Sequence, residues 1–128
     1  MDDFKRSLVR FNINGVMYRW NVKTIWEAAR DCSIEEIPLS YFDKELENDR
    51  WFQSYMKPTI SNIMKHFTRF MEADLNFPII LSPQGIVLDG IHRIVKAHLS
   101  GLSTIKAIRL KELPISDYLD DKPFTSNS

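Results

Sequence analysis

Two short runs near the start of the chain, 9–13 and 16–20, alternate apolar and polar residues on either side of Asn14-Gly15. A period of two is typical of a β-strand with one buried face. Asn-Gly is the preferred dipeptide of a type I′ turn, because both of its positions take positive φ. The pattern therefore predicts a β-hairpin over residues 8–22.

The period changes after Pro58, where apolar residues recur at intervals of three and four. This spacing predicts an α-helix with one apolar stripe, capped by Thr59 and running to about Ala73. His66 and Arg69 lie at the edge of that stripe. The stripe itself consists of Ile60, Ile63, Met64, Phe67, Phe70 and Met71.

A shorter helix is expected after the hairpin, with Thr24 as its N-cap and Glu27 three residues on, which is the spacing of a capping box. Gly101 is well placed to end a further helix that starts near Ile91. Apolar runs bounded by turn residues predict the strands. The remaining expected elements are strands at 34–39, 79–81, 86–88 and 105–110, a helix at 91–100, and a loop or irregular helix at 41–55.

These elements predict an α/β or α+β fold, with a small mixed sheet and a few helices, preceded by the N-terminal hairpin. The 128 residues are enough for one domain with a single core. We expect that domain to cover residues 1–113. Residues 114–128 are expected to form a polar, partly disordered C-terminal tail.

Composition narrows the class of protein. The chain is 44% hydrophobic and 27% charged, as soluble globular proteins are. It has a single cysteine, Cys32, a start unlike a signal peptide, and no apolar run near the roughly 20 residues that span a bilayer. We therefore expect a cytoplasmic protein with no membrane partner, no disulfide and no structural zinc. Basic and acidic residues number 17 each, and this balance does not favour a DNA-coating role.

Cationic side chains gather at the expected start of the helix 91–100. His92 and Arg93 fall in its first turn, and Lys96 follows one turn later, so that all three can face one side. The N–H groups of a first turn have no intrahelical acceptor, and the helix dipole disfavours cations there. Gly90, just before the turn, lets an anion approach the backbone closely. The pattern predicts an anion site, most simply for a phosphate.

The same residues also have purely structural interpretations. Arg93 and Lys96 can be solvated surface charges, and His92 can pack on a neighbour. Asp89 can be an N-cap, can orient His92 or Arg93, or can hold Mg²⁺ beside a phosphate. Asp74, just past the long helix, can be a turn residue or can face the phosphate.

The stretch from Ile79 to Ile105 resembles the ParB/sulfiredoxin-like superfamily, whose pattern is a strand pair, a D-G-x-H-R or related turn, a helix and another strand. It is most similar to short bacterial proteins labelled ParB-like. These share an A-D-L-x-[YF]-P-I-I-L segment, here residues 73–81, and D-G-x-H-R-x-x-K-A, here residues 89–97. The resemblance covers roughly residues 22–112. Its upstream features match Trp51-Phe52, Pro58-Thr59 and His66.

The resemblance implies nucleotide use. Members of the superfamily include CTP-binding partition clamps, ATP-dependent reductases of peroxiredoxin sulfinate, free-serine kinases and reputed nucleases. The clamps carry G-E-R-R-x-R-A at this turn and a DNA-reading helical domain, neither of which is seen here. Sulfiredoxins have their reactive cysteine where Ile91 stands, so sulfinate reduction is not expected. The serine kinases share the turn, but their catalytic glutamate has no clear counterpart at Glu35 or Glu36.

We therefore expect a nucleotide-binding domain with phosphotransfer or phosphate-hydrolysis activity, using ATP or CTP with Mg²⁺. The alternative is a ParB-like DNA-binding module or nuclease without nucleotide turnover, and a protein that only senses a ligand is a third reading. The oligomeric state and the need for a metal stay open at this point. The expected catalytic residues are His92, Asp89 and His66, and the expected phosphate-binding residues are Gly90, Arg93, Lys96 and Asp74.

Overall fold

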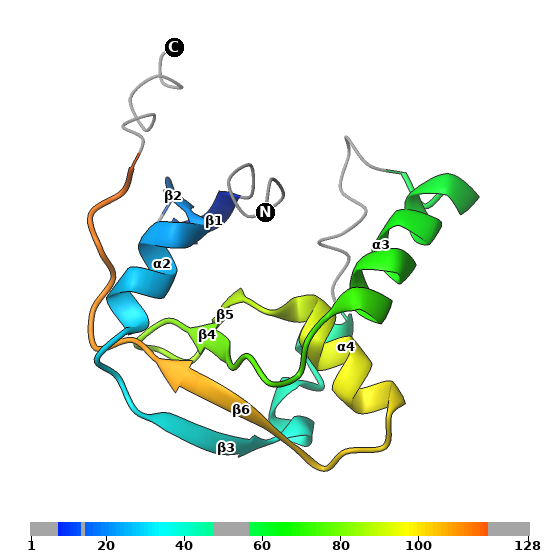
Figure 1. The fold of residues 1–128 in the computed structure, drawn as a ribbon. Coiled ribbons are helices and arrows are strands. Elements are labelled where there is room, and N and C mark those ends of the chain that lie inside the picture. Colours follow the sequence, from blue (N-terminus) through cyan, green and yellow to red (C-terminus); the bar gives the residue numbers. More distant parts are fainter. Residues whose placement is uncertain (1–7, 14, 48–56, 118–128) are drawn as a thin grey trace. The chain divides into compact units, whose positions relative to one another are not determined.

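The computed structural model describes residues 8–13, 15–47 and 57–117 (Figure 1). The mixed α/β fold expected from the sequence is confirmed, with strands in two sheets and an N-terminal hairpin. The strands are β1 (Leu8–Ile13), β2 (Val16–Asn21), β3 (Ile34–Pro38), β4 (Ile79–Leu81), β5 (Val87–Asp89) and β6 (Thr104–Arg109). The helices are α2 (Val22–Ala29), α3 (Ile60–Glu72) and α4 (Ile91–Leu99), with 3₁₀ turns at Leu39–Phe42 and Glu45–Glu47.

The chain divides into two compact units that interleave along the sequence. Unit 1 takes its described residues from 1–34, 80–89 and 108–128, and unit 2 takes its described residues from 35–79 and 90–107. Strands β3, β6, β4 and β5 form a four-stranded sheet in that order. The units are described separately below.

In unit 1 the predicted hairpin is confirmed. β1 and β2 pair antiparallel, with Val9 opposite Trp20 and Ile13 opposite Val16. Gly15 has a φ of 88° and donates its N–H to Asn12 Oδ1 at 3.0 Å, as a tight turn requires. Asn14 lies outside the described residues. The core of unit 1 consists of Val9, Trp20, Val22, Ile25, Ala29, Ile80, Leu88, Ile108 and Leu110.

Helix α2 begins three residues earlier than the capping-box spacing predicts. Its N-cap is Asn21, so the expectation that Thr24 caps it is wrong. The Thr24 hydroxyl instead donates to Asp117 Oδ2 at 2.7 Å, and the same carboxylate accepts from the N–H of Asn21 at 2.8 Å. A carboxylate from the distant tail thus supplies the acceptor at this helix start, which is electrostatically favourable.

Further tail residues follow the edge of strand β2. Trp20 Nε1 donates to the carbonyl of Pro114 at 3.0 Å, and the Ser116 hydroxyl both accepts from and donates to the backbone of Arg19. The N–H of Asp117 also donates to the Arg19 carbonyl, at 2.9 Å. Residues 114–117 are therefore part of unit 1, while residues 118–128 lie outside the described residues.

In unit 2 the cap and extent predicted for α3 are confirmed. The Thr59 hydroxyl accepts from the N–H of Asn62 at 3.1 Å, and the helix ends at Glu72. α3 packs beside α4 (Figure 1). The α3 residues that become half-buried are Asn62, His66 and Phe70, at a spacing of four. Phe70 is the stripe residue on this side of α3, and the other residues of the apolar stripe are exposed.

The other predicted elements of unit 2 are also present. The run 34–39 forms β3, and the segment expected to be a loop or irregular helix has two 3₁₀ turns in its described part, with Trp51 and Phe52 outside the described residues. Gly101 ends α4 as expected, with a φ of 79° and the N–H of Leu102 bonded to the Ala97 carbonyl at 3.1 Å, as in a Schellman motif. The buried apolar residues of this unit are Ile37, Leu39, Phe42, Ile79, Ile94, Ala97, Ile105 and Ala107.

Candidate functional site

The start of α4 is formed by a glycine that no other residue can replace without strain. Gly90 is the N-cap, and its φ of 125° lies in a region that L side chains rarely adopt. A Cβ built there would collide with Ile79 Cγ2 and lie 2.7 Å from Ile79 Cβ. The first helical bond joins the N–H of Ile94 to the Gly90 carbonyl at 3.0 Å. Since the cap has no side chain, no side-chain oxygen of residue 90 covers the N–H groups of the first turn.

Two histidines meet at this helix start, one from each helix. His66 Nδ1, on α3, lies 3.0 Å from His92 Nε2, in the first turn of α4. The rings stack with centroids 5.2 Å apart and planes inclined by 16°. At this distance one nitrogen carries the proton and the other accepts it, so the pair shares one N–H between two rings.

The surroundings hold this pair in its neutral form. The pKa of His92 is lowered to about 4 by burial, with further lowering by the charges of His66, Arg69 and Arg93. The pKa of His66 is lowered by burial and then by Arg69. At pH 7 both imidazoles are therefore neutral, each able to donate from one ring nitrogen and accept at the other.

Besides burial and the charge of a protonated His66, two guanidinium groups oppose protonation of His92. Arg93 is half-buried in the first turn of α4, and Arg69 is exposed on α3. A field of this sign attracts anions and repels metal cations. The described residues include no group of three or more His, Cys, Asp or Glu side chains that could hold a metal ion.

Arg69 was not among the residues expected at the site. The signal for it was present in the sequence, because Arg69 follows His66 by three positions and residues three apart lie on one side of a helix. In the sequence it stands out only as a residue at the edge of the apolar stripe. What the sequence did not reveal is that α4 packs along that edge and brings His92 into the reach of its charge.

Lys96 and Asp74, both expected to bind phosphate, have local partners. Lys96 Nζ donates to the carbonyls of Met71 at 3.0 Å and Ala73 at 2.7 Å, and so stabilises the negative end of the α3 dipole. Asp74 is exposed, and its Oδ1 accepts from the N–H of Asn76 at 2.9 Å in a turn that follows α3. Lys96 thereby joins α4 to the end of α3, whereas the contact of Asp74 lies within its own turn.

Asp89 ends β5 in unit 1 and immediately precedes Gly90 in the chain. It is not the N-cap of α4, so that structural interpretation is wrong; the cap is Gly90, one residue later. Asp89 Oδ2 accepts a hydrogen bond from Trp26 Nε1 at 2.9 Å. The indole of Trp26, on α2, therefore orients this carboxylate.

Comparisons of the chain with protein-family models, with curated proteins and with solved structures find no match. The resemblance to the ParB/sulfiredoxin-like superfamily therefore stays a prediction from the motif residues. Among the helices of the described residues, none is long and apolar enough to cross a membrane.

Proposed function

We propose that unit 2 binds the phosphate of a nucleotide at the start of α4, and that the His66–His92 pair transfers a proton there during phosphotransfer or phosphate hydrolysis. One observation carries the proposal: two neutral imidazoles are bonded at 3.0 Å beside a helix N-terminus, in the field of two arginines. Each part of this arrangement has its own role.

The anion would be bound by the backbone and by cationic side chains. The N–H groups of the first turn and the positive end of the α4 dipole favour a phosphate at Gly90, where the cap residue itself has no side chain. Arg93 can offer a planar pair of donors that matches two phosphate oxygens. Arg69 adds charge from α3. Lys96 is engaged with α3 carbonyls and is not needed for this role.

The histidine pair would supply acid–base chemistry. A neutral His92 can accept a proton at one ring nitrogen while the other is bonded to His66. A phosphate nearby stabilises the imidazolium and raises the pKa of His92 from about 4 towards neutrality, where a catalytic base is most effective. His66 is the positioning residue, since its bond holds the His92 ring in orientation.

The nucleotide part of the proposal comes from the resemblance of Asp89-Gly90-Ile91-His92-Arg93 to the D-G-x-H-R turn. It favours ATP or CTP as the ligand. Magnesium would accompany the phosphates, because the residues around His92 in unit 2 are cationic and do not suit a resident divalent ion.

Binding is tested by thermal denaturation of the purified protein with nucleoside mono-, di- and triphosphates, with and without Mg²⁺. A ligand that binds only the folded state raises the melting temperature by mass action. We expect a shift that Arg93→Gln abolishes and that Arg30→Gln, an exposed arginine of unit 1, preserves. The absence of a shift with every nucleotide, or an Arg93→Gln protein that binds as well as wild type, would refute the binding site.

Turnover is tested separately, by following nucleotide consumption and phosphate release. His92→Gln should retain binding and lose turnover. If the protein binds a nucleotide but does not consume it, the result would support a protein that only senses its ligand. Affinity for nucleic acid with a steep salt dependence, together with no nucleotide binding, would support the DNA-binding or nuclease alternative instead.

A further inference from the structure

Helix α3 is docked in unit 2 with little burial of its side chains. All thirteen of its residues are described by the structure, and none of them is buried. Among the described elements, α3 packs chiefly against α4. The side chains that become half-buried are those of Asn62, His66 and Phe70. Because burial of apolar surface supplies most of the packing energy, a helix with so little of it depends strongly on its polar contacts.

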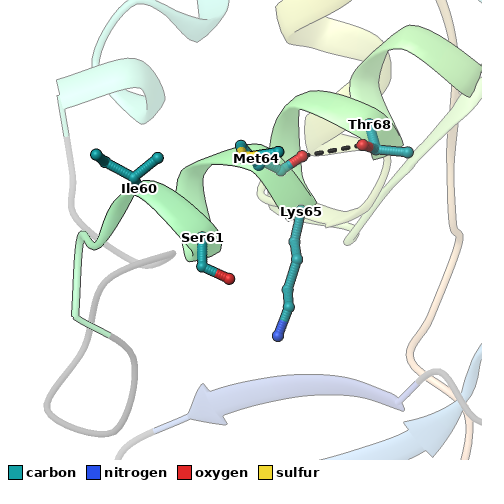
Figure 2. Close-up of a pocket in the computed structure, with 5 residues that line it drawn as sticks. All are labelled: Ile60, Ser61, Met64, Lys65 and Thr68. Atoms are coloured by element: carbon teal, nitrogen blue, oxygen red, sulfur yellow. Dashed lines mark hydrogen bonds between the residues drawn. The ribbon is translucent and has the colours of Figure 1, made fainter.

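The opposite side of α3 adds little to this docking. Figure 2 shows Ser61, Met64 and Thr68 bordering an open hollow. Met64 and Thr68 lie about 160° around the helix from His66, since each residue turns the helix by about 100°. The Met64 side chain is exposed, and the Thr68 hydroxyl donates to the Met64 carbonyl at 3.0 Å, within α3 itself. The docking of α3 therefore depends on the side that carries His66.

Two polar contacts tie α3 to α4. At the C-terminal end of α3, Lys96 Nζ donates to the carbonyls of Met71 at 3.0 Å and Ala73 at 2.7 Å. In the middle of α3, His66 Nδ1 lies 3.0 Å from His92 Nε2, and the two rings stack with centroids 5.2 Å apart. The first contact involves no imidazole. The second contact depends on the number of protons that the two histidines carry.

The hydrogen bond between His66 and His92 requires that one of the two facing nitrogens has no proton. When one ring or both are neutral, one nitrogen donates and the other accepts. When both rings are imidazolium, two N–H donors and two positive charges face each other at 3.0 Å. The other charges that act on His92, those of Arg69 and Arg93, are also positive. The 3₁₀ turn Leu39–Phe42, which packs against α4 as well, has no Asp, Glu, Lys, Arg or His side chain.

We propose that protonation of both histidines releases α3 from α4, so that the His66–His92 pair acts as an acid-sensitive switch between the two helices. Burial and the neighbouring positive charges lower the pKa of His92 to about 4 while α3 is docked, whereas the ordinary pKa of a histidine is 6.5. Between these values the released state binds more protons, so acid favours it. Release therefore increases as the pH falls below 6.5, and no further gain comes from His92 below pH 4.

Release changes both the helix and the candidate site. A helix of thirteen residues without tertiary contacts is marginal in water, so the amide N–H groups of a released α3 exchange with solvent. His66 and Arg69 move with α3, away from His92 and Arg93, and the group of cationic and imidazole side chains is lost. The switch needs no phosphate and is tested without one, so its outcome is independent of the proposed phosphate binding.

Amide hydrogen–deuterium exchange of the full chain at pH 7 and pH 5, without phosphate, tests the proposal. The protection of a segment is its intrinsic exchange rate at each pH divided by the measured rate. We expect the protection of α3 to fall roughly tenfold between pH 7 and pH 5, after solvent screening is allowed for. The β1–β2 hairpin of unit 1 should keep its protection, because the switch does not unfold the chain.

Glutamine variants identify the groups responsible. A glutamine amide can donate and accept but carries no titratable proton. The double variant with His66→Gln and His92→Gln should therefore show the same α3 protection at both pH values, whether or not the amides restore the bond. His98→Gln, at an exposed histidine near the end of α4, is the matched control and should respond as wild type. Wild-type α3 protection that is equal at both pH values, or that falls only together with that of the hairpin, would overturn the proposal. So would a double variant that keeps the pH response.

Discussion

His66 and His92 are joined by a 3.0 Å ring-to-ring hydrogen bond although 26 residues separate them in the sequence. The bond links the middle of α3 to the first turn of α4. Both rings have a lowered pKa because they are partly buried and lie near Arg69. The pair is thus a neutral group in a positive field, and this combination leads to the first two predictions.

Stability should fall as the pH is lowered from about 7 to about 4. In the unfolded chain His92 takes up a proton near pH 6.5, whereas in the folded protein its pKa is about 4. Between these values the unfolded state binds more protons, so the free energy of unfolding decreases as the pH falls. The contribution of His92 is about 2 kcal/mol once solvent screening is allowed for, fully present above pH 6.5 and lost below pH 4.

Urea denaturation of wild type and His92→Gln across this range provides the measurement. The variant should show a smaller loss of stability between pH 7 and 4, with the remainder due to His66 and to the carboxylates. Equal slopes for the two proteins would mean that His92 is not held neutral in the folded state.

Inorganic phosphate should raise the pKa of His92. An anion at the start of α4 offsets the charges of Arg69 and Arg93 that help to lower it. The imidazole signals of the protein, followed by NMR during pH titrations with and without phosphate, report this shift directly. In the Arg93→Gln protein the effect of phosphate should shrink, while Arg30→Gln should behave as wild type. A His92 titration that phosphate does not move would argue against an anion beside this ring.

Gly90→Ala should destabilise the protein by about 3 kcal/mol, since it combines an unfavourable positive φ with a collision against Ile79. Gly101→Ala is the matched comparison. It also has a positive φ, but a Cβ there meets no atom within 4 Å, so its cost should be only about 1 kcal/mol. Thermal unfolding of both variants measures the difference, and similar losses would show that packing against Ile79 is unimportant.

Lys96→Met should destabilise the protein by about 1–2 kcal/mol, because it removes the ammonium bonded to the carbonyls of Met71 and Ala73. Lys106→Met, at an exposed position of β6, should have little effect. Phosphate affinity separates this structural role from the expected anion-binding one. If Lys96→Met has normal stability but a strongly reduced affinity for phosphate, this result would support a role for Lys96 in binding the anion.

The features that could be predicted from the sequence are those determined by near neighbours in the chain. Three such features are present: the hairpin that turns at Gly15, the N-cap of α3 at Thr59 and the end of α4 at Gly101. Each depends on a few consecutive residues. The position of Gly90 at a helix start could be predicted for the same reason. Its packing against Ile79 could not, because that contact depends on how distant segments meet.

The features that could not be predicted depend on partners far away in the sequence. Thr24 has the local spacing of an N-cap, but Asp117, 93 residues later, competes for its hydroxyl. Lys96 follows His92 and Arg93 by one helical turn, which suggested that it binds the same anion. Its ammonium group instead donates to a carbonyl at the end of α3. Periodicity likewise identifies the apolar stripe of α3 without saying that its polar edge, with His66, packs against α4.

The hydrogen bonds of residues 114–117 to strand β2 and helix α2 have a consequence for the order in which the chain can fold. The hairpin is synthesised well before this segment, since the carbonyl that accepts from the Trp20 indole belongs to Pro114, 94 residues later. The carboxylate at the start of α2 arrives later still, with Asp117. Such long closures are slow to form. The hairpin and α2 are thus completed only after residues 114–117 have been synthesised, although the residues that bond to this segment lie more than 90 positions earlier.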